Sequence, residues 1–120
     1  MKLLITGGAG FIGSNLLHYL HHKYPRYTLI NFDKLTYAGN LENLKEIESS
    51  QNYRFIKGDI ANGDEIEPLF KIGLDGVINL AAETHVDRSI DRSDIFIITN
   101  VLGTQTLLDL ARKYKVTRFL

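Results

Sequence analysis

Closely spaced glycines at the start of the chain are its best candidates for chemistry. Gly7, Gly8, Gly10 and Gly13 follow a short, mainly apolar run at residues 2–5, after the single residue Thr6, and open an amphipathic segment. Residues without a Cβ let the backbone turn sharply and approach a bound group, and the N–H groups of a helix's first turn attract anions. A glycine turn between a strand and a helix therefore predicts a site for the pyrophosphate of a dinucleotide.

An acidic residue follows the second apolar run at the distance that such a site requires. Asp33 lies twenty positions after Gly13, where a carboxylate at the end of the second strand accepts hydrogen bonds from the hydroxyls of a cofactor ribose. The same charge repels a 2′-phosphate, and no arginine accompanies the adjacent Lys34 to reverse that preference. We therefore expect NAD(H), and not NADP(H), as the cofactor.

Length and charge narrow the class of protein. The chain has 120 residues, enough for one domain but short for a complete dinucleotide enzyme. Fourteen basic residues balance fourteen acidic ones, so overall charge favours neither nucleic acid nor an anionic membrane. The absence of cysteine excludes disulfides and thiol chemistry. No signal peptide or membrane span is evident, and we expect a cytoplasmic protein without nucleic-acid or membrane partners.

Short apolar runs alternate with amphipathic segments, which is typical of an α/β fold. Strands are expected at residues 3–5, 27–32, 53–57, 76–81 and 117–120, and helices after the glycine turn and at 41–48, 64–71 and 94–114. This alternation predicts one Rossmann-type domain over residues 1–120, a doubly wound parallel sheet with strand order 3-2-1-4-5 and a truncated fifth strand. In the first helix, Ile12, Leu16, Tyr19 and Leu20 are expected to form the sheet-facing stripe.

The predicted strand order places a crevice beyond the carboxyl ends of strands one and four. Four polar or glycine-containing segments, each directly after a strand, would project into it: residues 7–13, 33–36, 59–60 and 81–84. We therefore expect the cofactor to bind there.

Five segments resemble, in order and spacing, the extended short-chain dehydrogenases/reductases. They are residues 6–13, 33–40, 58–60, 81–90 and 99–104. The first and last are common to the superfamily, whereas the second and fourth resemble its sugar-nucleotide 4,6-dehydratases. Thr84 stands where these enzymes often have serine, and it keeps the hydroxyl. The resemblance extends over the whole chain.

The resemblance implies an NAD-dependent lyase that acts on a nucleotide-linked hexose, with dTDP-glucose as the favoured substrate. Such an enzyme oxidises the sugar at C4, removes water across C5 and C6, and reduces C6, which regenerates NAD. Two alternatives stay open. One is a UDP-sugar 4-epimerase or decarboxylase of the same superfamily, and the other is a non-catalytic NAD-binding or interaction module.

The resemblance also implies roles for individual residues. Phe11 and Ile12 would offer backbone N–H groups to the pyrophosphate, beside Gly7, Gly10 and Gly13. Further cofactor contacts would come from Asp33, Lys34, Leu35 and Thr36 at the ribose, Asp59 and Ile60 at the adenine, Leu80, Ala81 and Ala82 under the cofactor's middle, and Thr99. The substrate side would carry Thr84, His85 and Arg88.

No catalytic residue is expected within these 120. Family members place a Ser-Thr-Asp-Glu segment and a Tyr-x-x-x-Lys pair further along the chain, so we expect the NAD-binding part of a longer enzyme, inactive alone. Tyr19 and Lys23 have the pair's spacing but lie too far down the first helix, and we interpret Tyr19 as a packing residue. His18, His21 and His22 lack a further ligand, so no metal site is expected.

The predicted helix over residues 94–114 carries more apolar residues than one sheet-facing stripe requires. They are Ile95, Ile98, Val101, Leu102, Leu108 and Ala111. The resemblance implies that this helix pairs with its counterpart across a dimer interface, and we expect a homo-oligomer. Asn100, within the same helix, is interpreted as a residue that bonds to backbone and not as a catalyst.

Overall fold

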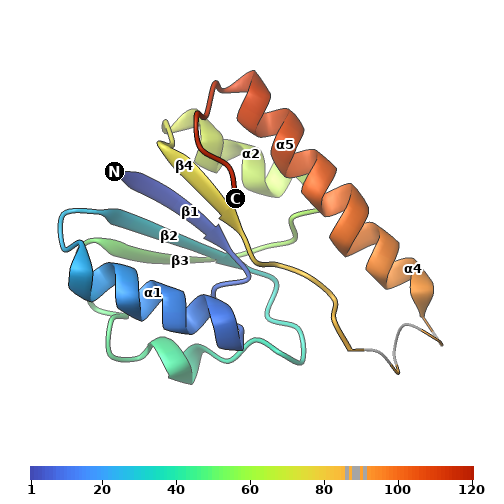
Figure 1. Cartoon of the computed structure of the whole chain (residues 1–120), viewed down its shortest axis with the longest axis horizontal. Coiled ribbons are helices and arrows are strands. Elements are labelled where there is room, and N and C mark those ends of the chain that lie inside the picture. The colour runs from blue at the N-terminus through green and yellow to red at the C-terminus, as the bar shows by residue number, and fades with distance from the viewer. Residues whose placement is uncertain (86, 88–89, 91) are drawn as a thin grey trace.

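Four parallel strands form the central sheet of the computed structural model, which describes residues 1–85, 87, 90 and 92–120. The strands lie in the order β3-β2-β1-β4, as the sequence predicted. Their bounds are Lys2–Thr6 for β1, Thr28–Asp33 for β2, Tyr53–Lys57 for β3 and Gly76–Asn79 for β4 (Figure 1). The carboxyl ends of all four strands therefore meet at one edge, where the sequence placed the crevice.

The last residues of the chain extend the sheet beside β4 without completing a fifth strand. Phe119 forms an isolated parallel bridge with Val77. The Val77 N–H donates to the Arg118 carbonyl at 2.9 Å, and the Leu120 N–H donates to the Val77 carbonyl at 3.0 Å. The predicted fifth position is thus occupied, by a bridge instead of a strand.

Helices cover both faces of the sheet. The helix α1 (Phe11–Lys23) lies on one face, while α2 (Gly63–Lys71) and α5 (Thr104–Lys113) lie on the other (Figure 1). A short 3-10 turn, η1 (Leu41–Leu44), follows β2. Before α5 come α4 (Ser93–Phe96) and the π-helical η2 (Ile97–Gly103), and the three make one continuous helical rod. No helix among the described residues is long and apolar enough to cross a membrane.

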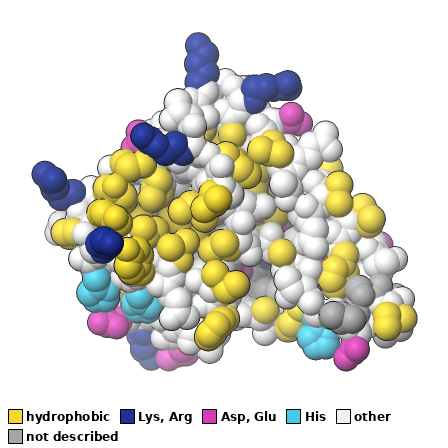
Figure 2. Space-filling view, in the orientation of Figure 1, with side chains coloured by type: hydrophobic (Ala, Val, Ile, Leu, Met, Phe, Trp, Pro, Cys, Tyr) yellow, Lys and Arg dark blue, Asp and Glu magenta, His cyan; other side chains and the backbone are white. Residues whose placement is uncertain are grey.

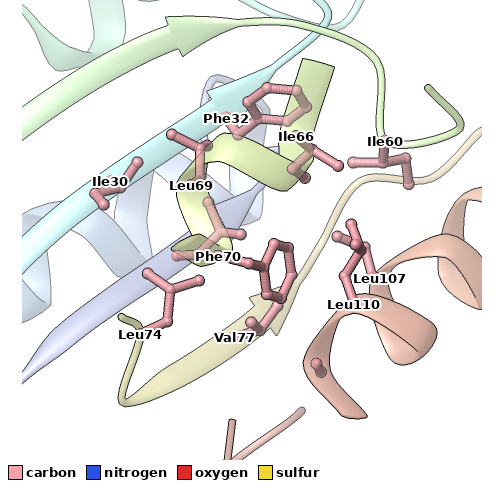
Figure 3. Packing of buried hydrophobic residues seen from close by; sticks show 12 residues of the cluster. Ile30, Phe32, Ile60, Ile66, Leu69, Phe70, Leu74, Val77, Leu107 and Leu110 are labelled. Atoms are coloured by element: carbon pink, nitrogen blue, oxygen red, sulfur yellow. The ribbon is translucent and has the colours of Figure 1, made fainter. Parts of the chain in front are cut away.

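Two hydrophobic cores form because successive residues of a strand point to opposite faces of the sheet. Leu4 faces α2 and α5, whereas Leu3 and Ile5 pack with α1. Figure 3 shows the first core, in which side chains from β2, β4, α2 and α5 meet. Its labelled members are Ile30, Phe32, Ile60, Ile66, Leu69, Phe70, Leu74, Val77, Leu107 and Leu110.

The buried face of α1 differs from the predicted stripe. Leu20 is buried and Leu16 packs against the core, as predicted, but Ile12 and Tyr19 are 68% and 50% exposed, and the helix instead buries Gly13 and Leu17. The reason is the glycine turn: a Cβ on Gly13 would lie 2.3 Å from the carbonyl oxygen of Gly7. This close backbone approach fixes the rotation of the helix, so the residues one and two turns beyond Gly13 face the sheet.

Polar groups link α2 to the end of the rod. The Glu67 carboxylate accepts hydrogen bonds from the Lys113 ammonium at 2.6 Å and from the Tyr114 hydroxyl at 2.7 Å. These two donors lower the pKa of Glu67 from 4.5 to about 2, with a smaller contribution from the charge of Lys71. Glu67 therefore stays ionised, and can hold both partners, at acidic pH values where an ordinary glutamate becomes protonated.

Candidate functional site

A cleft opens at the carboxyl ends of β1, β2 and β4. The glycine turn, the loop after β2, the segment after β4 and one residue of η2 form its walls. Its lining residues are Gly7, Gly10, Asp33, Lys34, Thr36, Ala38, Gly39, Leu80, Ala81, Ala82, Glu83 and Thr99. The structure thus brings together most of the residues that the sequence proposed for the cofactor, from four separate parts of the chain.

The glycines of the turn fall into two kinds. Gly7 has a φ of +67°, and an added Cβ would lie 2.5 Å from the Ala81 nitrogen, so the fold itself requires glycine there. Gly10 differs, because the single atom of the described residues near an added Cβ is the Gly7 oxygen, at an ordinary 3.4 Å. Gly10 also has a φ of −76°, which any residue adopts. The fold therefore does not need a glycine at this position, and the space beside Gly10 is open to the cleft.

The first turn of α1 suits an anion. Gly10 precedes the helix without a side-chain cap, and the first turn contains no acidic residue. The helix α2 is different, since the Asn62 side chain accepts from the Asp64 N–H and two acids lie in its first turn. Phe11 and Ile12 therefore offer backbone N–H groups that no side chain caps, in the positive end of a helix dipole.

Asp33 joins the glycine turn to the loop after β2. The residue is 9% exposed, and its carboxylate accepts from the Ala9 N–H at 2.9 Å and from the Leu35 N–H at 2.8 Å. The Ala9 carbonyl in turn accepts from the Asn40 N–H at 3.0 Å, at the far end of that loop. Leu35 has a φ of +55°, a conformation that non-glycine residues rarely adopt and that clusters at ligand sites. Each oxygen of Asp33 keeps a second lone pair, which a ribose hydroxyl can use.

Asp59 and Lys34, which come from different strand ends, form an ion pair beside the cleft. Their nearest charged atoms, Lys34 Nζ and Asp59 Oδ2, are 2.6 Å apart, and the Ala61 N–H donates to Asp59 Oδ1 at 2.9 Å. Burial alone would raise the pKa of the Asp59 carboxyl, but the hydrogen bonds from Lys34 and Ala61 and the charge of Lys34 together hold it below its usual value. Asp59 is therefore an anion with a fixed orientation.

The side chain of Ile60, a residue that the family resemblance places beside the adenine, points into the core. It is 4% exposed and belongs to the core shown in Figure 3, where a Cβ on Gly103 would lie 2.6 Å from it. Packing against the rod directs this side chain inward, so only its backbone is left to contact a cofactor. Asp59, its neighbour, keeps its carboxylate on the outer side, against Lys34.

Asn100 holds the segment after β4 against the rod. Its amide oxygen accepts from the Glu83 N–H at 2.8 Å, and its amide nitrogen donates to the Glu83 carbonyl at 2.9 Å. The interpretation of Asn100 as a backbone-bonding residue is confirmed. Its neighbour Thr99 lines the cleft. The π-helical η2 thus both holds the segment after β4 and contributes to the wall of the cleft.

A chain of hydrogen bonds fixes the same segment from the other side. The Thr6 hydroxyl donates to the Asn79 side-chain oxygen at 2.6 Å and accepts from the Ala81 N–H at 3.4 Å. The Asn79 amide nitrogen donates to the Thr104 hydroxyl at 3.2 Å. Together with Asn100, these bonds tie β1, β4 and the rod together behind Leu80–Glu83, so the floor of the cleft is preformed.

The residues proposed for the substrate side lie beyond the cleft. Thr84 and His85 are exposed in the segment after β4. The His85 ring packs edge-to-face on the Tyr37 ring with 6.0 Å between centroids, which joins this segment to the loop after β2. Arg88 lies outside the described residues.

Two groups of side chains on α1 lie away from the cleft. The Lys23 ammonium donates to the Tyr19 hydroxyl at 2.5 Å, and Tyr19 is half exposed, so its interpretation as a packing residue was wrong. His18 and His22 each approach Glu46, with nitrogen–oxygen distances of 3.8 and 3.7 Å. In the described part of the chain, no three His, Cys, Asp or Glu side chains are placed to hold a metal ion.

Three lining residues were not named as site residues from the sequence. Ala38 and Gly39 belong to the loop that Asp33 and Asn40 anchor, and Glu83 lies in the segment that Asn100 holds. A signal for all three was present, since each falls within a motif that follows a strand of the sheet. Small residues in such loops leave room for a ligand.

Comparison with known proteins agrees with this geometry. Residues 4–120 match the family model described as GDP-mannose 4,6 dehydratase. The dTDP-glucose 4,6-dehydratase of Salmonella typhimurium is 52% identical over 115 residues, which cover 95% of this chain and 32% of that protein. The chain thus spans about a third of the length of such relatives.

Solved structures are similar over almost the whole chain. The crystal structure of dTDP-glucose 4,6-dehydratase from Bacillus anthracis in complex with NAD has a TM-score of 0.88 and 47% identity, covering 99% of this chain and 36% of that one. UDP-glucose 4-epimerase from Thermotoga maritima, solved with UDP-glucose, has a TM-score of 0.87 and 33% identity, covering 99% and 36%. Because the family model fits nearly every residue from β1 onward, the chain belongs to the GDP-mannose 4,6 dehydratase family, within the short-chain dehydrogenases/reductases.

Proposed function

We propose that residues 1–120 are the NAD-binding domain of a dTDP-glucose 4,6-dehydratase. The observation that carries this proposal is the cleft itself. In it lie the first turn of α1, which no side chain caps, the space that the missing side chain of Gly10 leaves, and the Asp33 carboxylate. The relatives at about 50% identity are dTDP-glucose 4,6-dehydratases, and one of their structures contains NAD. The epimerase is a second candidate, supported by its similar fold at lower identity.

The residues of the cleft suit the parts of NAD. The N–H groups of Phe11 and Ile12 would hold the pyrophosphate at the position that Gly10 leaves open. Asp33 would accept from the adenosine ribose while it keeps its bonds to the two loops. The remaining proposed contacts are Lys34, Leu35 and Thr36 near the ribose, Asp59 near the adenine, Leu80, Ala81 and Ala82 under the cofactor, and Thr99.

The bound NAD would supply a reversible hydride acceptor for the sugar. These 120 residues would bind and orient it, and Thr84 and His85 would lie toward the nucleotide-linked hexose. We propose that the groups moving protons in the elimination lie outside residues 1–120, so that this part alone turns over no sugar nucleotide. Arg88 is proposed for the substrate side on the family resemblance alone.

The choice of cofactor tests the proposal. We expect the chain to bind NAD more tightly than NADP, because the Asp33 carboxylate at the ribose repels a 2′-phosphate. Asp33→Ala should weaken NAD binding about tenfold or more, since hydrogen bonds to a charged group are worth about 1.5–3 kcal/mol. Isothermal titration calorimetry with both cofactors measures this.

A matched carboxylate serves as the control for this test. Asp109 is exposed on α5, where its Oδ1 lies 3.6 Å from Arg112, so Asp109→Ala should leave both affinities unchanged. Circular dichroism would verify that Asp33→Ala is folded, because that change also removes the hydrogen bonds that Asp33 accepts from the Ala9 and Leu35 N–H groups. Equal affinities of the unaltered chain for NAD and NADP would contradict the proposal.

Self-association through the rod is also proposed. Apolar side chains stay on its surface: Ile97 is 61% exposed, Val101 57% and Leu108 48%. Figure 2 shows hydrophobic side chains along the rod and over the sheet beside it. Light scattering over a concentration series should detect a self-associated species, and Val101→Glu should shift it toward monomer, because a charge opposes burial of this face. A monodisperse monomer at high concentration would refute this expectation.

A further inference from the structure

We infer that Asp59 helps to set cofactor choice by holding Lys34 away from the 2′-position of the adenosine ribose. This inference rests on the proposed function, and it adds a specificity-determining residue to the same site. It starts from two adjacent residues with opposite charges in the sequence. Asp33 at the end of β2 disfavours a 2′-phosphate, whereas the residue that follows it, Lys34, carries a charge that attracts one.

Lys34 stands where it could contact a 2′-phosphate. It lines the cleft beside Asp33, and its side chain is 54% exposed, so it has room to move. A lysine ammonium on a flexible four-carbon chain readily binds phosphate as a point charge. Without a competing partner, this side chain would offset much of the repulsion from Asp33.

The structure supplies that competing partner. Lys34 Nζ lies 2.6 Å from Asp59 Oδ2, and the Asp59 side chain is less exposed, at 24%. Asp59 is also held from two directions: its Oδ1 accepts from the Ala61 N–H at 2.9 Å, and its own N–H donates to Glu65 Oε2 at 2.8 Å. The acid is therefore the fixed member of the pair and the lysine the mobile one. The ammonium is drawn toward the end of β3, and the Asp33 charge near the ribose is left unopposed.

Removing only the charge of Asp59 tests whether its carboxylate holds the Lys34 ammonium away from a 2′-phosphate. Asn in place of Asp keeps the size of the side chain and an oxygen that accepts from Ala61 N–H. Lys34 would then be free to reach a 2′-phosphate. In Asp59→Asn we expect the NADP-to-NAD affinity ratio to rise about fivefold, the scale of one exposed charge pair.

The experiment measures NAD and NADP affinities by calorimetry for the unaltered chain, Asp59→Asn, Lys34→Gln and the double variant. The rise in the ratio should appear in Asp59→Asn, should be absent from Lys34→Gln, and should disappear in the double variant. It should also shrink in high salt, because exposed charges are screened. Asp109→Asn, which breaks an exposed ion pair with Arg112 on α5, is the matched control and should leave the NADP-to-NAD affinity ratio unchanged.

The outcomes separate this inference from the proposed function. If the unaltered chain binds neither cofactor, both fail. If it prefers NAD but the ratio is unchanged in Asp59→Asn, only the role of Asp59 is overturned. A rise that persists in the double variant would also overturn it, since repulsion by Asp59 itself, and not release of Lys34, would then be the cause. Should Asp59→Asn not fold, a tenfold loss of NADP binding in Lys34→Gln would show that Lys34 already reaches the phosphate, which the inference forbids.

Discussion

Gly10→Val should abolish NAD binding and leave the fold intact. An added Cβ at this position would lie an ordinary 3.4 Å from the Gly7 oxygen, and the backbone conformation suits any residue, so the chain itself tolerates a side chain there. The branched side chain would instead occupy the cleft at the start of α1, where the pyrophosphate is proposed to bind. We expect at least a hundredfold loss of affinity, because several charge-assisted hydrogen bonds would be lost together, at about 1.5–3 kcal/mol each. Calorimetry measures the binding, and circular dichroism the fold.

Gly13→Ala is the matched contrast within the same turn. Its Cβ would lie 2.3 Å from the Gly7 oxygen and 2.6 Å from the Gly8 Cα, both backbone atoms that cannot move aside. We expect a loss of about 3 kcal/mol or more in the free energy of unfolding, since overpacking against backbone must shift the helix. If Gly10→Val unfolds the chain as severely as Gly13→Ala, or if it still binds NAD normally, the distinction between the two glycines is wrong.

Asn100→Leu should loosen the floor of the cleft. The change leaves both the N–H and the carbonyl of Glu83 without the partners that Asn100 gives them. Unsatisfied polar groups cost about 1–3 kcal/mol each when buried, and these are partly buried, so we expect a loss of about 1–3 kcal/mol in total. Chemical denaturation measures the stability. NAD affinity should fall as well, because Ala81 and Ala82 would no longer be held in place.

Two further variants on the rod sharpen this test. Asn100→Asp retains an oxygen for the Glu83 N–H but places the other oxygen against the Glu83 carbonyl. Its free energy of unfolding should therefore lie between those of the unaltered chain and Asn100→Leu. The Thr106 hydroxyl donates to the Leu102 carbonyl in an exposed hydrogen bond within the rod, and Thr106→Ser, which keeps that hydroxyl, should change stability by no more than about 0.5 kcal/mol. Unchanged cofactor affinity in Asn100→Leu would show that the floor is positioned by other contacts.

The parts of the site that follow local rules could be predicted from the sequence. The turn at Gly7–Gly13 and the acid at Asp33 are set by strand-end geometry and by the spacing of adjacent elements. Thr99 could be placed only through the family resemblance, because its position depends on how a distant helix crosses the sheet. The strand order also followed from alternation of strands and helices, which allows few topologies.

The errors arose where a tertiary contact overrode a periodic pattern. The apolar spacing of Ile12 and Tyr19 suggested a buried stripe, but the contact of Gly13 with Gly7 rotates α1 away from it. The apolar spacing over residues 94–114 predicted one uniform helix, and it did not predict the π-helical η2 that lies between α4 and α5.

The two hydrogen bonds of Ala9 have a consequence for how this protein can vary. Its N–H bonds to Asp33 and its carbonyl bonds to the N–H of Asn40, so the loop between them is anchored at both ends. Asn40 then starts η1, where its side chain accepts from the Glu42 N–H. Surface loops generally tolerate insertions and deletions. Here, adding or removing one residue would move either the Asp33 carboxylate or the start of η1, so the length of this loop is constrained as strictly as the spacing of the glycines.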